Sequence, residues 1–129
     1  MTQISKVETG QAPRAIGPYS QAIIAGDWIF CSGQIAIDPQ TQDLISGGIK
    51  EQTERVLKNL GAILESAGSS MPRIVKTDIY LKNLSDFKEM NEIYAGFFPG
   101  DEKPARATVK ISGLPKNALI EISCIALIN

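Results

Sequence analysis

The spacing of apolar residues along the chain changes from a strand-like period to a helical one and back. Apolar runs in QISKVET and in SQAIIAGDWIFCSGQIAI predict strands, and a tight turn at Gly26 and Asp27 divides the second run. A further turn is predicted in DPQTQD, residues 38–43, where the proline is well placed to start it. The chain up to this point is therefore expected to form strands joined by turns.

An amphipathic helix is predicted from Ile49 onward. Its apolar stripe consists of Val56, Leu57, Leu60, Ile63, Leu64 and Ala67. Gly48 is placed to cap the first turn, with Glu51 reaching back as in a capping box, and Gly68 is placed to end the helix in the left-handed conformation.

A second helix is predicted to begin near Ser85 or Asp86, with Glu89 placed for a capping box on Asp86, and to end before Pro99. Strands are predicted on either side of it, in RIVKTDIYLKN and at residues 105–112 and 119–128. This order of elements predicts one α+β domain over residues 1–129, in which two helices pack on one face of a mixed sheet of about six strands.

The last predicted strand, LIEISCIALI, is apolar on both of its faces, which is typical of a central strand that is buried on both sides. Two helices can cover only about one face of such a sheet, so another copy of the chain is expected to cover the other face. Glu121 interrupts this strand. A carboxylate there needs a cation or hydrogen-bond donors, and both a structural ion pair at a subunit interface and a functional role fit it.

The strand in EKPARATVKI places Arg106, Thr108 and Lys110 on one face. The opposite face, which carries Ala105, Ala107, Val109 and Ile111, is expected to face the core. Two interpretations of Arg106 remain open, a solvated strand arginine or a cation that a ligand approaches between small neighbours.

Three further positions combine a structural and a functional interpretation. Tyr19 follows Gly17-Pro18, which restricts the backbone before it, and it is either a packed aromatic or an oriented phenol. Ser32 and Gly33 lie where a strand ends or bulges, and a glycine there allows close approach to the backbone. Asn91 lies beside the apolar stripe of the second helix, where an amide must find hydrogen bonds.

Composition narrows the chemistry that these residues can perform. With 129 residues, a net charge of -1 and no run of like charges, the chain has no feature of a nucleic-acid or membrane-surface protein. A polar N-terminus and the absence of a long apolar run predict a cytoplasmic protein, and Cys31 and Cys124 are expected to be buried and reduced. The chain has no histidine, which excludes Ser-His and Cys-His nucleophile pairs and histidine-bearing metal sites.

Four segments together, AIGPYSQAI, CSGQIAIDP, IVKTDIYLKNLSDFKEMNEIYAGFF and PARATVKISGLPKNALIEISCIA, resemble the RidA (YjgF) family of reactive intermediate deaminases in order and spacing. The resemblance covers nearly the whole chain. It implies a chorismate-mutase-like fold and a homotrimer with clefts between subunits. It also implies hydrolysis of 2-imino acids, such as 2-iminopropanoate and 2-iminobutanoate, to 2-keto acids and ammonia.

The same resemblance assigns roles to residues of this chain. Arg106 matches the binder of the substrate carboxylate and Glu121 the residue that holds or activates water. Positions that line the cleft are matched by Tyr19, Ser32, Gly33 and Asn91, and substrate binding is expected at these residues and at Thr108, which departs from the family pattern. Many members with this activity carry cysteine at the last of these, so a thiol-based role does not transfer to Thr108. No metal and no cofactor is expected. The alternatives are a non-catalytic ligand-binding or regulatory trimer and, less favoured by the net charge, an RNA-directed activity.

Overall fold

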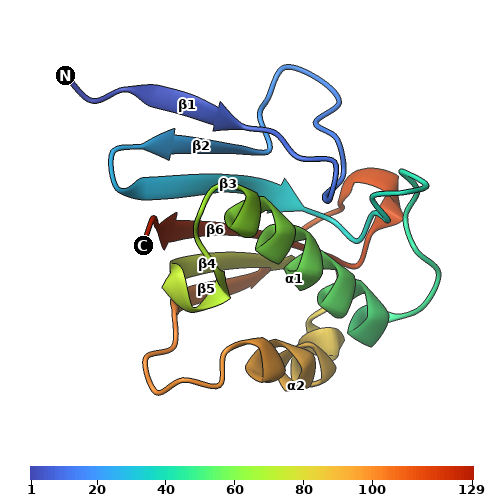
Figure 1. Cartoon of the computed structure of the whole chain (residues 1–129). Helices are drawn as coiled ribbons and strands as arrows, with labels where there is room; N and C mark the ends of the chain where they lie inside the picture. Colours follow the sequence, from blue (N-terminus) through green and yellow to red (C-terminus); the bar gives the residue numbers. More distant parts are fainter.

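A computed structural model describes residues 1–129 and shows six strands in one sheet, with two helices on one of its faces (Figure 1). The strand order is β1-β2-β3-β6-β4-β5, and every pair is antiparallel except the parallel pair of β4 and β5. The strands are β1 Ile4–Val7, β2 Ala22–Ala25, β3 Trp28–Gln34, β4 Ile74–Leu81, β5 Ala105–Lys110 and β6 Ile120–Leu127. The predicted α+β fold is confirmed.

The first helix, α1 Ile49–Ser66, has the predicted apolar stripe in the core and the predicted ends. At its start the backbone N–H of Gly48 donates a hydrogen bond to the Glu51 carboxylate at 2.8 Å. At its end Gly68 has a φ of 85°, and the N–H of Ser69 bonds back to the carbonyl of Leu64. Gly68 is suited to this left-handed position because it has no Cβ.

The second helix, α2 Phe87–Phe97, begins differently from the prediction. A short 3₁₀ turn, Leu84–Asp86, precedes it, and Asp86 makes no side-chain capping bond. The Asp86 N–H is already bonded to the carbonyl of Asn83 inside that turn. The predicted capping box on Asp86 is therefore wrong. Glu89 instead lies 3.9 Å from Lys50 of α1, so its charge helps join the two helices.

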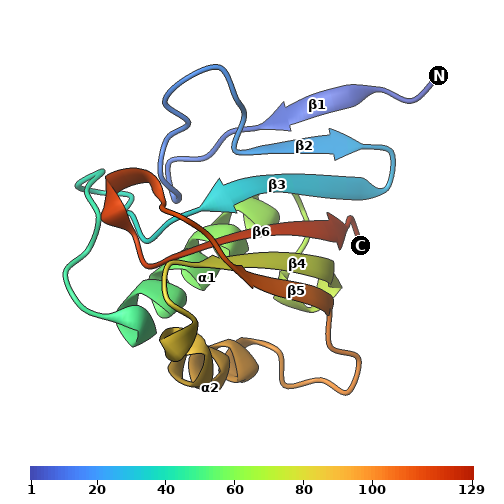
Figure 2. The same ribbon diagram turned by 180° about the vertical axis from the view of Figure 1, so that it is seen from behind.

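The core lies between the helices and the sheet, and the predicted central strand β6 runs through its middle. Four alternate residues of β6 are buried under the helices, namely Ile120, Ile122, Cys124 and Ala126. Cys124 lies directly opposite Cys31 of β3, and both thiols are free and buried as predicted. The opposite face of the sheet, which we call the open face, has no helix in front of it (Figure 2).

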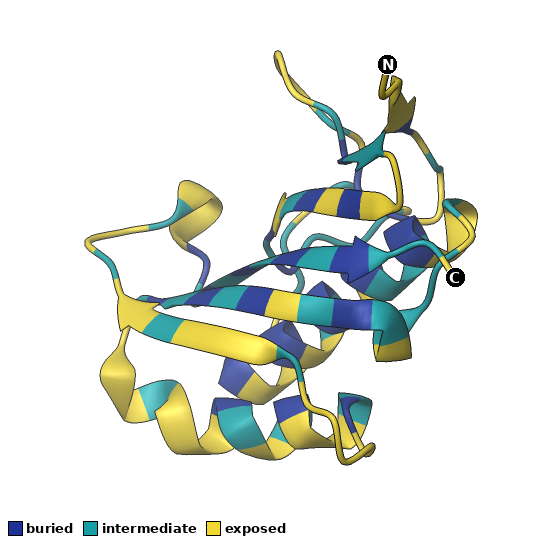
Figure 3. Cartoon of the chain, turned by 90° about the vertical axis from the view of Figure 1, so that its left-hand side faces the viewer, coloured by how far each residue is buried: buried dark blue, intermediate teal, exposed yellow.

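The open face carries apolar side chains that one chain leaves partly exposed. Trp28 and Phe30 are each 43% exposed and Val109 is 46% exposed. The predicted core face of β5 lies here, and Figure 3 shows this edge strand exposed along most of its length. The expectation that Ala105, Ala107 and Val109 face the core is therefore wrong within one chain, because both helices lie on the side of Arg106. No helix in the structure has the length and apolar character that crossing a membrane requires.

Candidate functional site

The predicted bulge at Ser32 and Gly33 brings β3 against Glu121. The register between β3 and β6 shifts between Cys31 and Gln34. Ser32 and Gly33 therefore lie opposite the single residue Ser123 of β6. A Cβ added to Gly33 would lie 2.4 Å from Oε2 of Glu121. The sequence predicted that a glycine here allows close approach to the backbone, and the group that approaches is the carboxylate of Glu121.

Glu121 projects from β6 onto the open face and has no charged partner. It forms no salt bridge and no side-chain hydrogen bond within the chain, although it is partly buried. Burial raises the pKa of its carboxyl group above the ordinary value. A carboxylate with a raised pKa is a stronger base than an exposed one, so it is better suited to take a proton from water near neutral pH.

A cavity of about 530 Å³ opens in front of this carboxylate. Its lining includes three predicted site residues, Tyr19, Gly33 and Glu121, together with Arg14 and Lys116. Gly17, with a φ of 125°, allows the turn in which the Tyr19 N–H bonds to the Gly17 carbonyl. This turn directs the phenol back over the backbone N–H of Ile16, which donates to Tyr19 Oη at 3.4 Å. Tyr19 is therefore oriented locally, as its sequence context indicated.

Ser32 does not line that cavity. Its hydroxyl donates a 2.6 Å hydrogen bond to the carbonyl of Ser20, and its N–H bonds to the carbonyl of Gln21. Both bonds join the bulge of β3 to the segment that carries Tyr19. Ser32 therefore helps to hold Gly33 and Tyr19, its neighbours at the cavity, in position.

Arg106 lies on the other face of the sheet, among side chains of α2. Its Nη1 donates a 2.6 Å hydrogen bond to Oδ1 of Asn91. Its guanidinium carbon lies 5.0 Å from the ring centre of Tyr94 and 5.6 Å from that of Phe87. Arg106 has no carboxylate partner in the chain and lines a second cavity, of about 350 Å³, together with Asn91. Arg106 is exposed, but these contacts with α2 distinguish it from a freely solvated strand arginine.

Thr108 follows Arg106 on the same face of β5 and has an unused polar atom. Its Oγ1 is buried and has no hydrogen-bond partner in the chain. A buried hydroxyl without a partner destabilises a protein by about 1 to 3 kcal/mol. The Thr108 hydroxyl is therefore an unsatisfied buried group on the face of β5 that carries Arg106.

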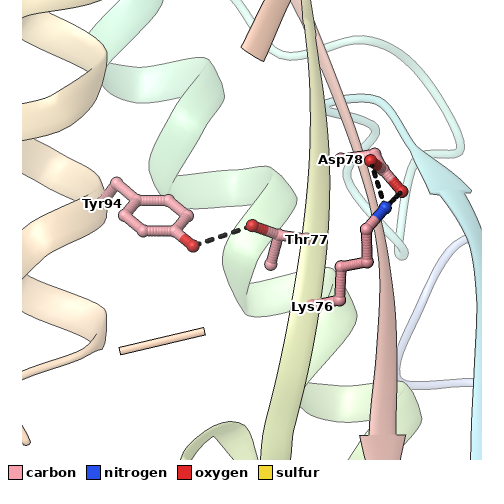
Figure 4. A network of polar contacts seen from close by, with 4 residues as sticks. All are labelled: Lys76, Thr77, Asp78 and Tyr94. Carbon is pink, nitrogen blue, oxygen red and sulfur yellow. Dashed lines mark hydrogen bonds and ion pairs between the residues drawn. The ribbon is translucent and has the colours of Figure 1, made fainter. Parts of the chain in front are cut away.

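Arg106 and Glu121 project from opposite faces of the sheet. Arg106 stands beside Thr77, whose side chain points to α2, whereas Glu121 stands beside Tyr80 on the open face. Figure 4 shows the same alternation on β4, with Thr77 on one side and Lys76 and Asp78 on the other. One chain therefore cannot present both Arg106 and Glu121 to one small substrate.

Sequence reasoning missed the residues that surround Arg106. Phe87 and Tyr94 were read only as part of a helix, although their spacing from Asn91 already places all three on one face of it. Arg14 and Lys116, which line the Glu121 cavity, had no signal beyond their charge. No group of three or more Cys, Asp or Glu side chains in the chain is arranged to hold a metal ion.

Known proteins share this sequence over nearly its whole length. The family model described as Endoribonuclease L-PSP matches residues 9–128. A RutC family protein of Pyrococcus abyssi is 55% identical over 118 residues, which cover 92% of each chain. The chloroplastic Reactive Intermediate Deaminase A of Arabidopsis thaliana is 50% identical over 93% of this chain and 64% of its own. The 2-iminobutanoate/2-iminopropanoate deaminase of Homo sapiens is 44% identical over 94% of this chain and 88% of its own.

Solved structures agree with this relationship. A protein of the conserved Rid family from Yersinia pestis superposes with a TM-score of 0.94 at 49% identity, covering 97% of this chain and 99% of its own. TdcF of E. coli with bound serine superposes with a TM-score of 0.90 at 38% identity, covering 95% of this chain and 98% of its own. In sequence and in fold, the chain belongs to the Endoribonuclease L-PSP family, which is the YjgF/RidA family.

Proposed function

We propose that this protein hydrolyses 2-imino acids to 2-keto acids and ammonia, in sites formed where the Arg106 side of one subunit meets the Glu121 side of another. One observation carries the proposal. A held guanidinium without an anion and a half-buried carboxylate without a cation lie on opposite faces of the same sheet. The guanidinium and the carboxylate carry opposite charges, and contact between two copies of the chain can bring them together.

A ring of three copies satisfies this requirement. A contact between two different faces of the same chain is heterologous, and such a contact closes into a ring when the rotation allows it. Every interface of the ring then contains one Arg106 and one Glu121. The apolar open face, with Trp28, Phe30 and Val109 exposed, supplies surface for this contact. A homotrimer therefore brings Arg106 and Glu121 together and also covers the apolar open face of the sheet.

In this site Arg106 binds the substrate carboxylate. Asn91 engages Nη1, and the guanidinium donates no other hydrogen bond within the chain. Its remaining N–H groups can grip a carboxylate through two parallel bonds, which fixes the plane of the adjacent C=N bond.

Glu121 serves first as base and then as acid. It takes a proton from water while the oxygen attacks C2 of the protonated imine, which gives a tetrahedral carbinolamine. It returns that proton to the nitrogen, and the C–N bond breaks as Glu121 takes the proton of the hydroxyl group, so that the carbonyl forms and ammonia is released. Glu121 passes this last proton to the ammonia, so the balance is one protonated imine and one water in, one 2-keto acid and one ammonium ion out. The Tyr19 hydroxyl lines the same cavity and is placed to bond the oxygen.

The preferred substrates are proposed from the named relatives. The human relative, 44% identical, is named for 2-iminobutanoate and 2-iminopropanoate, and we propose the same short 2-imino acids here. A ligand-binding trimer without turnover is the second candidate, because TdcF of E. coli, at 38% identity, is described with bound serine. The family description names an endoribonuclease, but a net charge of -1 offers no basic stripe for RNA.

The test is a coupled assay. A dehydratase generates 2-aminoacrylate from serine, its tautomer 2-iminopropanoate forms in solution, and pyruvate release is followed with and without this protein. We expect release to rise in proportion to protein concentration and to fall to the buffer rate with Glu121→Gln. Binding of serine without any acceleration of pyruvate release would favour the ligand-binding candidate. Cleavage of RNA by wild type, abolished in the same variant, would favour the ribonuclease.

A further inference from the structure

We infer that Phe87 and Tyr94 are positioning residues, which hold the Arg106 guanidinium in the orientation that binds a carboxylate. The inference rests on the proposed function for its ligand, but its geometry is complete within one chain. Neither residue was assigned a role from the sequence.

The three side chains that hold Arg106 come from successive turns of one helix. Phe87, Asn91 and Tyr94 are spaced four and three residues apart, so they lie in one row on the face of α2 that is turned to β5. The two rings approach the guanidinium carbon at 5.6 Å and 5.0 Å, within the range of a cation-π contact. Asn91 lies between Phe87 and Tyr94 in the sequence, and its amide oxygen accepts the hydrogen bond from Arg106 Nη1.

These contacts differ in kind from those of an ion pair. An aromatic face and an amide oxygen attract the cation without neutralising it, so the full charge remains for an incoming anion. An aspartate or glutamate in place of Asn91 would compete with the substrate. The arrangement restricts the motion of the side chain and leaves its charge and its remaining N–H groups unused.

Tyr94 is itself held by a buried hydrogen bond to the strand next to Arg106. Its hydroxyl lies 2.8 Å from Oγ1 of Thr77, which is fully buried on β4 (Figure 4). Burial raises the pKa of the Tyr94 phenol above its ordinary value, so the hydroxyl stays protonated and forms a neutral hydrogen bond with Thr77. Its ring also packs against Phe98, with ring centres 4.6 Å apart.

The register of the sheet closes this set of contacts into a loop. Thr77 is the direct neighbour of Arg106 in the parallel pair of β4 and β5. The strand pairing joins Arg106 to Thr77, the hydrogen bond joins Thr77 to Tyr94, and the ring of Tyr94 returns to Arg106. One route links the guanidinium to its own strand through Tyr94 and Thr77, and the hydrogen bond to Asn91 links it separately to α2. Restricting a binding group in this way preorganises it for its ligand.

Phe87 offers the cleanest test because it is 37% exposed and its replacement leaves the core intact. Phe87→Leu keeps an apolar side chain and removes the ring face, whereas Phe87→Tyr keeps the face. We expect Phe87→Leu to raise KM for 2-iminobutanoate, and Kd for the unreactive product 2-oxobutanoate, by about 2- to 5-fold with kcat nearly unchanged. Phe87→Tyr should restore both constants. Leu84→Ala, a change at another exposed apolar residue, serves as the control.

The hydrogen bond is tested by a double-mutant cycle. Thr77→Val and Tyr94→Phe each break the same bond and leave one buried hydroxyl without a partner, so each should weaken 2-oxobutanoate binding. The double variant should bind no more weakly than either single one, since the bond is lost only once. Additive losses would show that Thr77 does not act through Tyr94 and would overturn that part of the inference.

A direct observation of the arginine separates this inference from the proposed function. In a ¹⁵N NMR spectrum a held guanidinium gives a resolved Nε–Hε signal for Arg106, shifted by the ring currents of Phe87 and Tyr94. We expect Phe87→Leu to move and broaden this signal and Leu84→Ala to leave it unchanged. An unchanged signal and unchanged Kd in Phe87→Leu would overturn the inference even if imine hydrolysis is confirmed. A wild type that shows the held signal but hydrolyses no imine would instead contradict the proposed function alone.

Discussion

Arg106 and Glu121 project from opposite faces of one sheet, on β5 and β6, with only β4 between these two strands. Their separation by face is a consequence of register, because successive residues of a strand alternate between the two sides. An activity that needs both residues therefore depends on a second copy of the chain. Testing this dependence requires two different variants combined in one assembly.

Two inactive variants should restore activity when they share a trimer. Arg106→Ala and Glu121→Gln should each be nearly inactive, and co-refolding equal amounts should recover about one quarter of wild-type activity, because a random interface unites the two intact residues with that frequency. The measurement is imine hydrolysis before and after mixing. If both residues acted from one subunit, co-refolding would recover nothing.

Gly33→Ala should displace Glu121 without unfolding the protein. The new Cβ would lie 2.4 Å from Oε2 and 2.7 Å from the carboxyl carbon of Glu121, so this flexible side chain must move. We expect hydrolysis to fall by about 100-fold, as for a catalytic group misplaced by about 1 Å. Stability should change by less than about 1 kcal/mol. Gly113→Ala, where nothing lies within 4 Å of the added atom, is the matched control and should behave as wild type.

The pH dependence of stability should report the buried carboxyl group of Glu121. Burial raises its pKa in the folded state, so between the unfolded and folded pKa values the native protein binds more protons than the unfolded chain. The contribution of this group to stability is present below the unfolded pKa and is lost as pH rises through the folded one. For the dissociated chain, in which no Arg106 of another copy faces this carboxylate, the melting temperature of Glu121→Gln should therefore rise relative to that of wild type as pH rises from acidic to neutral. A constant difference across that range would contradict the burial effect.

Arg106→Lys should weaken catalysis while keeping the charge. Lysine cannot reproduce the two parallel hydrogen bonds of a guanidinium, and the loss of one charge-assisted bond, about 1.5 to 3 kcal/mol, corresponds to roughly 10- to 150-fold in kcat/KM. Arg106→Ala should lose more, since it also removes the charge. Both variants should melt close to wild type. An Arg106→Ala variant that unfolds, beside an Arg106→Lys variant with full activity, would make Arg106 a structural residue.

The open face should control assembly. Phe30→Asp places a charge on an exposed apolar position of β3, so we expect a shift from trimer to monomer in light scattering and a parallel loss of imine hydrolysis. Lys58→Ala, on the exposed side of α1, should change neither. A stable wild-type monomer at micromolar concentration would contradict the proposed assembly before any variant is made.

Local patterns were sufficient for the elements and for several details of the site. The helical period from Ile49, the left-handed Gly68 and the turn before Tyr19 each depend on residues close in the chain, so the sequence predicted them correctly. The bulge at Ser32 and Gly33 was one of two alternatives, and pairing with β6 selected it. The capping box on Asp86 failed because a 3₁₀ turn had already bonded the Asp86 N–H.

By itself the sequence determined which residues alternate on each strand, and the family resemblance predicts that Arg106 and Glu121 act on the same substrate. Only the tertiary structure decided which side of each strand the helices cover. The apolar alanine face of β5 suggested burial, but both helices lie on the arginine side, and this choice depends on contacts between segments far apart in the chain. That choice gives Arg106 the support of Phe87, Asn91 and Tyr94, and it leaves Glu121 on the face that another copy can reach.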